Sequence, residues 1–476
     1  MWTLGLAVLA AVATLATPQA PRFKVIREWK YVNFTWPDHE SYLKATDDGV
    51  YVPGNVVISG LKYYDGYYYI TLPRMKAGVP ATLTRIPAPE GGVLDTAPPL
   101  DPYPSWDMNM GDCDKLQNVQ NIEIDPSGRI WIIDGGRTET LSQPIVKCPP
   151  KLIIHDIKRN ETVRTYEFPE EVASFNGSYL YDLVLDLTDG DYAYITDNSG
   201  RDPGLIVYSY KENTSWKIRH SPSMRADPTA SRFQVNEVTV NAAINIAGIA
   251  LGPSIRSTPQ VTINDERQIF YAPLSSLHLY SVNSSVLKDK RNANDGNEYQ
   301  GTVTDHGLKA SQSVSMTMDD RGNLYYNLLA TNSIARWNAN TDFQTGQKSI
   351  ARDAKYLQWV NSFTFDRGNL TVLVNKLNKY LYGGLNINEE NFRIITAFID
   401  AKSYLYDNYG YMGPESTTMH EMLPEVHVHN SDMHDHTMMD GEDHVHGMTD
   451  NPIGKAGASA IVFNCALLVF MVILRL

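Results

Sequence analysis

The sequence predicts an all-β protein, specifically a six-bladed β-propeller, and three observations support this prediction. Tyrosine is abundant, with 28 residues, and glycine and proline are frequent, with 32 and 26 residues. Aromatic residues favour strands, whereas glycine and proline favour the turns between them. A strand, a polar or glycine turn and a second apolar strand recur six times, and no helical segment is expected between the repeats.

Each repeat alternates apolar residues around an Asp/Gly or Asn/Gly turn, which is the signal of a β-hairpin. The six hairpins are predicted at residues 60–70, 123–133, 186–195, 261–271, 316–326 and 363–373. Their markers Tyr69, Trp131, Tyr194, Phe270, Tyr325 and Thr371 are 62, 63, 76, 55 and 46 residues apart. This spacing fits one four-stranded sheet per repeat, and a closed ring protects the sheet edges. A β-sandwich or two separate β domains are the alternatives.

Composition and charge exclude some classes of protein. With 476 residues, of which 43% are hydrophobic, the chain can bury a sizeable core. Its net charge of −13 argues against a nucleic-acid partner, which would require a basic face. Ten acidic residues lie between Lys402 and Lys455, where there is no Lys or Arg, so the predicted folded body is close to neutral.

Residues 1–16 are predicted to be a secretory signal peptide. Leu4–Ala16 is a run of apolar and small residues interrupted by Thr14, and Pro18 and Pro21 follow it. Small residues at the −3 and −1 positions fit cleavage after Ala16. Six N-glycosylation sequons support secretion, at Asn33, Asn160, Asn176, Asn213, Asn283 and Asn369. We therefore expect an extracellular glycoprotein.

The chain beyond the signal peptide divides into a propeller body (22–402), an acidic stalk (403–455) and a hydrophobic tail (456–476). The apolar run of the tail, Ala458–Leu474, would be about 26 Å long as a helix. Small residues before it and the lack of a basic cluster after it indicate a GPI signal. The short polar spacer and Arg475 favour a retained single span, and a buried helix is a third interpretation. Both main interpretations predict a tether to the outer membrane surface.

The stalk is rich in histidine and methionine and poor in aromatic and β-branched residues, so it is expected to be disordered. It holds three His-x-His pairs, which are His427 with His429, His434 with His436, and His444 with His446. Imidazole suits Cu(II) and Zn(II), and the thioether of methionine suits Cu(I). We therefore expect weak copper or zinc binding, with a solvated tether as the alternative. No cofactor is expected to be required by the body.

Cys113 and Cys148 are the cysteines of the predicted body, since Cys465 lies in the tail. In an oxidising compartment we expect them to form a disulfide. Closing this loop would stabilise the fold by about 3–4 kcal/mol in the chain-entropy model.

Several short motifs follow one another along the body. They include Ile70–Arg74, Pro102–Trp106, Gly111–Cys113, Ile130–Gly136, Cys148–Leu152, Gly204–Ser209, Gly248–Pro253, Leu357–Trp359 and Asn391–Ile394. In their order and spacing they resemble the yellow/major royal jelly protein family over most of residues 22–400. The resemblance implies a secreted or surface six-bladed propeller, with links to insect pigmentation and cuticle. It does not imply one activity, because the fold alone does not set function.

The resemblance also implies a ligand site in the mouth of the central channel, where propellers bind ligands. Asn361 and Phe363 resemble the channel-lining Asn-x-Phe of amine-binding salivary members. Asn361 would hydrogen-bond a small aromatic ligand, a biogenic amine or a catechol, and Phe363 would stack on its ring. Asp134 and Asn332 are further candidates for the lining. Ordinary strand and turn roles are the alternative for all four.

Two other hypotheses remain. Some family members look like dopachrome-converting enzymes, and an isomerase or decarboxylase would need a base and a donor for the developing negative charge. His306, within Asp305–Gly307, is the candidate catalytic residue, with a solvated loop residue as the alternative. The third hypothesis is a surface protein that acts through protein contacts in eggshell or cuticle assembly. The sequence does not identify that partner.

Overall fold

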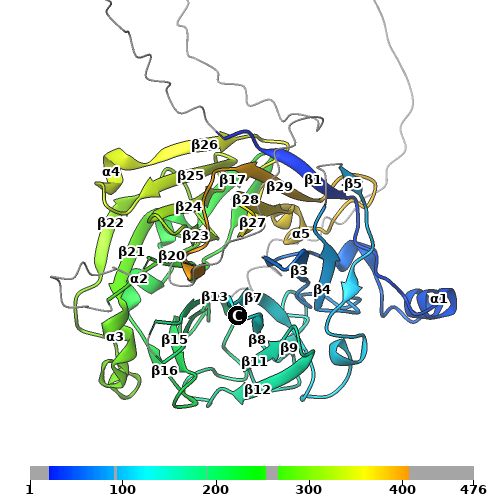
Figure 1. Ribbon diagram of the computed structural model, residues 1–476, viewed down its shortest axis with the longest axis horizontal. Helices are drawn as coiled ribbons and strands as arrows, with labels where there is room; N and C mark the ends of the chain where they lie inside the picture. Colours follow the sequence, from blue (N-terminus) through cyan, green and yellow to red (C-terminus); the bar gives the residue numbers. More distant parts are fainter. Residues whose placement is uncertain (1–20, 90–93, 189, 254–265, 407–476) are drawn as a thin grey trace, which may run out of the picture.

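The structure is a computed structural model that describes residues 21–89, 94–188, 190–253 and 266–406. Six β-sheets, the blades, surround a central axis (Figure 1). This arrangement confirms the predicted all-β, six-bladed propeller. The predicted signal peptide, most of the stalk and the hydrophobic tail lie outside the described residues.

Each blade runs from an innermost strand at the axis to an outermost strand at the rim. Blade 1 contains β2 (Leu61–Tyr64), β3 (Tyr67–Thr71), β4 (Leu83–Pro87) and β6 (Asp101–Pro102). Blade 2 contains β7 (Val119–Ile124), β8 (Arg129–Asp134), β11 (Lys151–Asp156) and β12 (Glu161–Glu167). Blade 3 contains β13 (Leu180–Asp186), β14 (Tyr192–Asp197), β15 (Gly204–Ser209) and β16 (Thr214–Ile218).

The second half of the ring follows the same order. Blade 4 contains β19 (Ile246–Leu251), β20 (Gln268–Pro273), β21 (His278–Asn283) and β22 (Thr304–Leu308). Blade 5 contains β23 (Met316–Met318), β24 (Asn323–Leu328), β25 (Ser333–Asn338) and β26 (Lys348–Arg352). Blade 6 contains β27 (Val360–Asp366), β28 (Asn369–Val374), β29 (Phe392–Phe398), β1 (Lys24–Trp29) and the short β5 (Asp95–Thr96).

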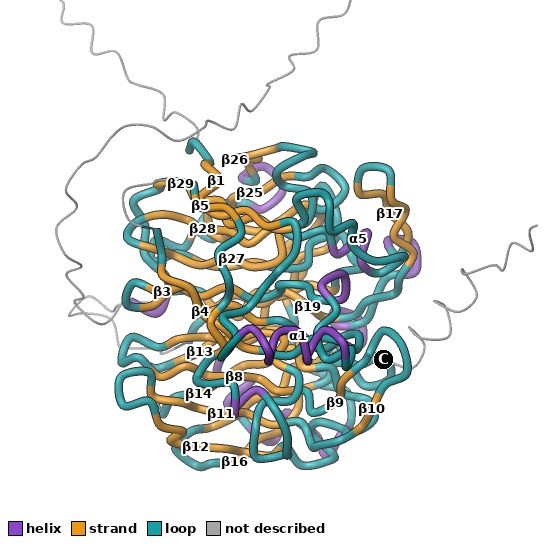
Figure 2. The backbone as a smooth tube through the Cα atoms, turned by 90° about the vertical axis from the view of Figure 1, so that its right-hand side faces the viewer, coloured by secondary structure: helices purple, strands orange, loops and turns teal. Residues whose placement is uncertain are grey.

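Short elements lie in the connections within and between the blades. The α-helices are α1 (His39–Asp47), α2 (Ser221–Met224), α3 (Ser284–Lys288), α4 (Phe343–Gly346) and α5 (Leu377–Tyr380). The 3-10 helices are η1 (Pro53–Asn55), η2 (Asp107–Asn109), η3 (Pro228–Ala230), η4 (Lys290–Gly296) and η5 (Tyr404–Tyr406). Two small hairpins pair β9 (Arg137–Thr138) with β10 (Ile145–Val146) and β17 (Arg232–Val235) with β18 (Val238–Asn241). Figure 2 shows β9, β10, β17 and α5 at one end of the propeller.

The ring is closed by strands from the two ends of the described chain. The N-terminal strand β1 pairs antiparallel with β29, with Trp29 opposite Phe392, so blade 6 combines both ends. This pairing joins the last blade to the start of the chain, and the innermost strand β27 lies beside β2 of blade 1. Closure of the ring leaves no open edge between the first and the last blade.

A buried aspartate explains the repeated hairpin motif. In blade 2, Asp125 Oδ2 accepts the indole N–H of Trp131 at 3.1 Å, and its Oδ1 accepts two backbone N–H groups of the turn. In blade 5, Asp319 Oδ2 likewise accepts the hydroxyl of Tyr325 at 3.1 Å. Buried carboxylates need such partners. The marker aromatics of blades 2 and 5 therefore hold the turn in addition to filling the core.

The fourth predicted hairpin needs a correction. The innermost strand of blade 4 is β19, which pairs with β20, whereas the predicted first strand at 261–264 falls in the stretch 254–265 that the structure does not describe. Every residue of β19 is buried, so this strand lacks the alternation of a half-exposed hairpin. The polar residues before Arg267 predict a hairpin at 261–271, but the strand that pairs with β20 is β19.

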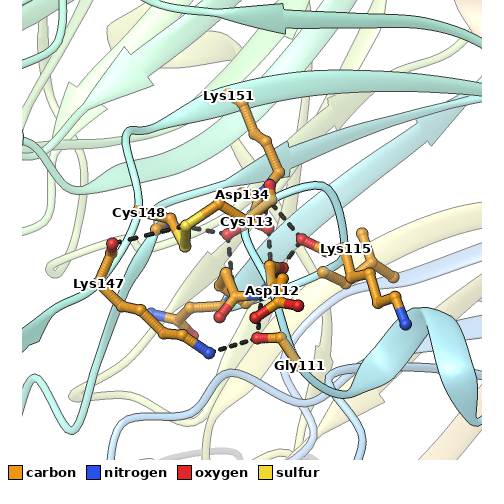
Figure 3. The surroundings of a disulfide bond; sticks show 12 residues. Gly111, Asp112, Cys113, Lys115, Asp134, Lys147, Cys148 and Lys151 are labelled. Carbon is orange, nitrogen blue, oxygen red and sulfur yellow. Dashed lines mark hydrogen bonds and ion pairs between the residues drawn. A yellow bond between two sulfur atoms is a disulfide. The ribbon is translucent and has the colours of Figure 1, made fainter.

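Cys113 and Cys148 form the predicted disulfide, with their Cα atoms 5.4 Å apart. The buried ammonium group of Lys151 lies beside it (Figure 3) and donates to the backbone carbonyls of Cys113 and Lys115. Lys151 Nζ is also 3.4 Å from Asp134 Oδ2, and both side chains are fully buried. The disulfide and this ion pair together fix the loop before β7 onto blade 2.

Candidate functional site

A small chamber lies on the propeller axis, and the innermost strand of every blade contributes to it. The lining is Lys62 from β2, Glu123 from β7, Asp182, Leu183 and Val184 from β13, Ile249 and Ala250 from β19, Ser315, Met316 and Thr317 at β23, Phe363 from β27, and Tyr404. In this conformation it holds about 10 Å³ of free space, which is room for one water molecule. Its axial position and convergent polar groups make it the candidate ligand site.

One lysine faces two carboxyl groups in this chamber. Lys62 Nζ lies 2.8 Å from Glu123 Oε2, and the two side chains are 14% and 7% exposed. Asp182 is also buried, and its Oδ1 accepts the amide Nδ2–H of Asn121 at 2.7 Å and the backbone N–H of Leu183 at 2.9 Å. The formal charges of Lys62 and Glu123 cancel, so the charge of the chamber depends on Asp182.

Burial raises the pKa of Asp182 to about 7. The nearby Lys62 ammonium and the Leu183 N–H act in the opposite direction, and the Glu123 carboxylate adds to the rise. Desolvation disfavours an ionised carboxyl more than these partners favour it. Near neutral pH the chamber therefore exchanges between a neutral and a singly negative state.

Tyr404 enters the chamber from η5, at the end where the innermost strands finish, which we call the lower end. Its hydroxyl accepts the backbone N–H of Leu185 at 3.1 Å and lies 3.4 Å from Glu123 Oε2. Ser403 forms a β-bridge with Asp319 of blade 5. The folded part of the chain thus continues past residue 402, and the segment after the last blade occupies the lower end of the chamber.

Asn361 and Phe363 lie on the same innermost strand and have different surroundings. Phe363 lines the chamber and also packs in an apolar cluster with Tyr325 and Leu370. Asn361 lies towards the upper end, where the innermost strands begin. Its Nδ2 donates to the carbonyl and hydroxyl oxygens of Ser59 at 3.0 and 2.9 Å, and its Oδ1 accepts the indole N–H of Trp359 at 3.1 Å. The amide of Asn361 therefore bonds to neighbouring protein groups in this conformation.

The hairpin β17–β18 reaches across to blades 5 and 6 at the upper end. Asn332, another predicted site residue, donates from Nδ2 to Asn236 Oδ1 of this hairpin at 2.9 Å. Asn236 in turn donates to the carbonyl oxygen of Ala354 at 2.8 Å. Val235 packs in one apolar cluster with Trp359 at the start of β27. Asn332 therefore holds the hairpin and does not line the chamber.

His306 and Asp134 also lie away from the chamber lining. His306 belongs to β22, the outermost strand of blade 4, where its ring packs against Phe270 and Trp337. Its Nε2 is 2.8 Å from the hydroxyl oxygen of Ser281, and burial lowers its pKa. Asp134 takes part in the buried ion pair beside the disulfide. The structure thus brings Phe363, but not these two residues, to the chamber.

Lys62, Glu123, Asp182 and Tyr404 are not among the residues predicted from the sequence. A signal for Asp182 was present, because it lies inside the mainly apolar strand β13, whose other acid, Asp186, is at the strand end. An isolated acid in a buried strand is uncommon unless it has a partner or a function. The identity of its partners could not be read from the sequence, since they come from other blades.

The predicted metal ligands belong to the stalk and stay a prediction. All six lie outside the described residues, and they are His427, His429, His434, His436, His444 and His446. Within the described part of the chain, no group of three or more His, Cys, Asp or Glu side chains is arranged to hold a metal ion.

The predicted membrane tether also falls outside the described ranges, because the tail begins at residue 456. None of the helices within 21–89, 94–188, 190–253 and 266–406 is long and apolar enough to cross a membrane.

Comparisons with known proteins agree with the fold. Residues 117–403 match the family model of the major royal jelly proteins. Protein yellow of Drosophila melanogaster is 28% identical over 400 residues, covering 82% of this chain and 72% of that protein. Protein yellow of Drosophila pseudoobscura pseudoobscura is 28% identical over 403 residues, covering 83% and 70%.

Two solved structures were also found to be similar. A luciferin-regenerating enzyme has a TM-score of 0.42 and 11% sequence identity, with coverage of 80% of this chain and 97% of that chain. The calcium-binding protein regucalcin from Agrobacterium tumefaciens has a TM-score of 0.41 and 11% identity, with coverage of 73% and 91%.

Proposed function

Because the chain belongs to the major royal jelly protein family, we propose that it binds a small aromatic amine in the chamber on the propeller axis. The observation that supports this is the presence of two carboxyl groups, Glu123 and Asp182, against the single Lys62. A protonated amine would balance the second carboxylate, and the ring of Phe363 offers an aromatic surface. Serotonin, dopamine and octopamine have this combination of ring and cation.

The chamber has to widen to accept such a ligand, because its free space corresponds to one water molecule. Tyr404 is the lining residue that comes from outside the blades. Its displacement would enlarge the chamber from the lower end without disturbing a strand of the ring. We therefore propose that the amine binds by replacing the Tyr404 ring next to Glu123.

Calorimetry of the full-length chain with the three amines tests this function. We expect saturable binding, which Asp182→Asn weakens at least about tenfold because an ammonium group loses its charged partner. Phe363→Leu should also weaken binding. Asp48→Asn is the control and should leave binding unchanged, because Asp48 is the C-cap residue of α1 and its side chain is 55% exposed. A folded wild type that binds none of the amines would contradict the proposal. Unchanged affinity in both chamber variants would exclude this chamber as the site.

Dopachrome conversion is the second candidate, and the pKa of Asp182 favours it. A carboxyl that titrates near pH 7 can give and take a proton at neutral pH, and Glu123 lies nearby. Consumption of dopachrome by the wild type, lost in Asp182→Asn with the fold retained, would support an enzyme. Amine binding without dopachrome consumption would favour the carrier function.

We further propose that the protein acts outside the cell, tethered through its hydrophobic tail, in pigmentation or cuticle biology. The N-terminal apolar run, the sequons and the tail support this location. Release of the protein from intact cells by a phospholipase that cleaves GPI anchors would support the anchor over the retained span. Recovery in the cytosolic fraction would contradict the location.

A further inference from the structure

A second recess, at the upper end of the propeller, contains a buried cationic side chain. Its lining includes Asn118 and Gln120 at the start of β7, Arg137 and Thr140 after β8, and Ser178 and Tyr179 before β13. Its free space is about 10 Å³. Because it sits between the upper ends of blades 2 and 3, it is separate from the axial chamber, whose lining shares none of these residues.

Arg137 is a buried cation, and the Asp197 carboxylate that offsets its charge at longer range is already paired with Lys217 at 2.8 Å. The residue is 2% exposed, and its guanidinium donates to the carbonyl oxygens of Asn176 at 2.8 Å and Ser178 at 2.7 Å. Within the described ranges, it forms no ion pair with a carboxylate. Desolvation is the main cause of its lowered pKa. Buried charges in proteins are normally paired, so a partner of opposite charge is expected here.

Arg74 provides a comparison at the same end of the propeller. All five of its guanidinium N–H groups donate to backbone carbonyl oxygens, including those of Val79 and Gln117. Carbonyl dipoles therefore satisfy every donor of this buried arginine. Arg137 has two such acceptors, so part of its donor fork is left for another group.

Thr140 adds a second donor to the recess. The residue is 1% exposed, and its hydroxyl, which neighbours that of Tyr179, makes no hydrogen bond of good geometry among the described residues. The Tyr179 hydroxyl donates instead to Gln120 Oε1 at 3.0 Å. Leaving a buried hydroxyl unpaired costs free energy, which an acceptor bound in the recess would recover.

We propose that this recess binds a small monoanion, either a halide or a carboxylate group, between the guanidinium of Arg137 and the hydroxyl of Thr140. A guanidinium presents a planar fork of donors that matches a carboxylate, and it also binds simple anions. The proposal is independent of amine binding, because the axial chamber is suited to a cation and this recess to an anion.

Thermal unfolding of the full-length chain in sodium bromide and in sodium formate tests the anion site. Ionic strength is held constant with sodium benzenesulfonate, whose anion carries no carboxylate group and is much larger than bromide or formate. We expect saturable stabilisation of the wild type by formate, bromide or both. The anion affinity should fall about tenfold in Thr140→Val, which keeps the side-chain shape, and the response should vanish in Arg137→Gln. Arg159→Gln, at an exposed ion-paired position, is the matched control.

The outcomes separate the possible ligands. A response to formate alone assigns the recess to carboxylates, and a response to both anions assigns it to small monoanions in general. Bromide in crystals should then give an anomalous peak between Arg137 and Thr140. Absence of a saturable response in the wild type would overturn the proposal, as would an unchanged affinity in Thr140→Val. If Arg137→Gln does not fold, the anion affinity of Thr140→Val alone tests whether the anion binds in this recess.

Discussion

Asn121 donates its amide Nδ2–H to Asp182 Oδ1 over 2.7 Å, and this bond joins the innermost strands of blades 2 and 3. A neutral amide holds the carboxyl in place without supplying the positive charge that would keep it ionised. Lys62, the nearby cation, is engaged by Glu123 at 2.8 Å. Asp182 is therefore positioned firmly, but its ionisation remains sensitive to what enters the chamber.

Asp182 should make the fold less stable as pH rises. Its pKa is raised to about 7, so between about pH 4 and pH 7 the folded state holds a proton that the unfolded state has lost. The stability from this group is complete below about pH 4 and is lost as pH approaches 7. Asp182→Asn should therefore gain stability relative to wild type over this range, by up to roughly 4 kcal/mol. Urea unfolding across this pH range measures the gain, and parallel pH profiles for the two proteins would contradict it.

Tyr404 should control access to the chamber. Tyr404→Ala removes the ring from the lower end, so amine association should be faster, while stability falls by about 3–5 kcal/mol. Tyr404→Phe keeps the ring and removes the hydroxyl that accepts the Leu185 N–H, at a cost of about 1–3 kcal/mol. Stopped-flow binding and urea unfolding separate these effects. An association rate in Tyr404→Ala equal to that of Tyr404→Phe would show that the ring does not limit entry.

The disulfide should stabilise the body measurably. Cys113 and Cys148 are separated by 35 residues, so replacing both with serine should cost about 3–4 kcal/mol. Reduction of the wild type should lower the unfolding midpoint to that of the double variant, which serves as the control. If reduction leaves the midpoint unchanged, the buried Lys151–Asp134 pair would be holding the loop without the disulfide.

The indole of Trp131 should stabilise the turn of blade 2 beyond its packing. Trp131→Phe removes the N–H bond to Asp125 and leaves a cavity, and we expect a loss of about 2–4 kcal/mol. Tyr325→Phe, which removes only the hydroxyl bonded to Asp319, should cost about 1–2 kcal/mol. Tyr67→Phe, on a side chain 36% exposed, is the control. If Tyr325→Phe and Tyr67→Phe are equally stable, the hydrogen bond from Tyr325 to Asp319 does not stabilise the turn.

Much of the fold could be predicted because its signals are local. The hairpins around Trp131 and Tyr325 combine alternation, a turn and a marker aromatic within about a dozen residues. The first strand of blade 4 could not be found in this way, because β19 is buried on both faces and shows no alternation. The bond between Asn361 and Ser59 could not be predicted in this way either, because Ser59 lies on a distant segment of the chain.

The propeller, its repeated hairpins and the disulfide can be inferred from the amino-acid sequence, because short-range patterning and two body cysteines specify them. The meeting of Lys62, Glu123 and Asp182 in one chamber cannot, since ring closure brings together strands that are far apart in the chain. The same holds for the buried charge of Arg137. Desolvation, which raises the pKa of Asp182 and lowers that of Arg137, exists only when the blades enclose these groups.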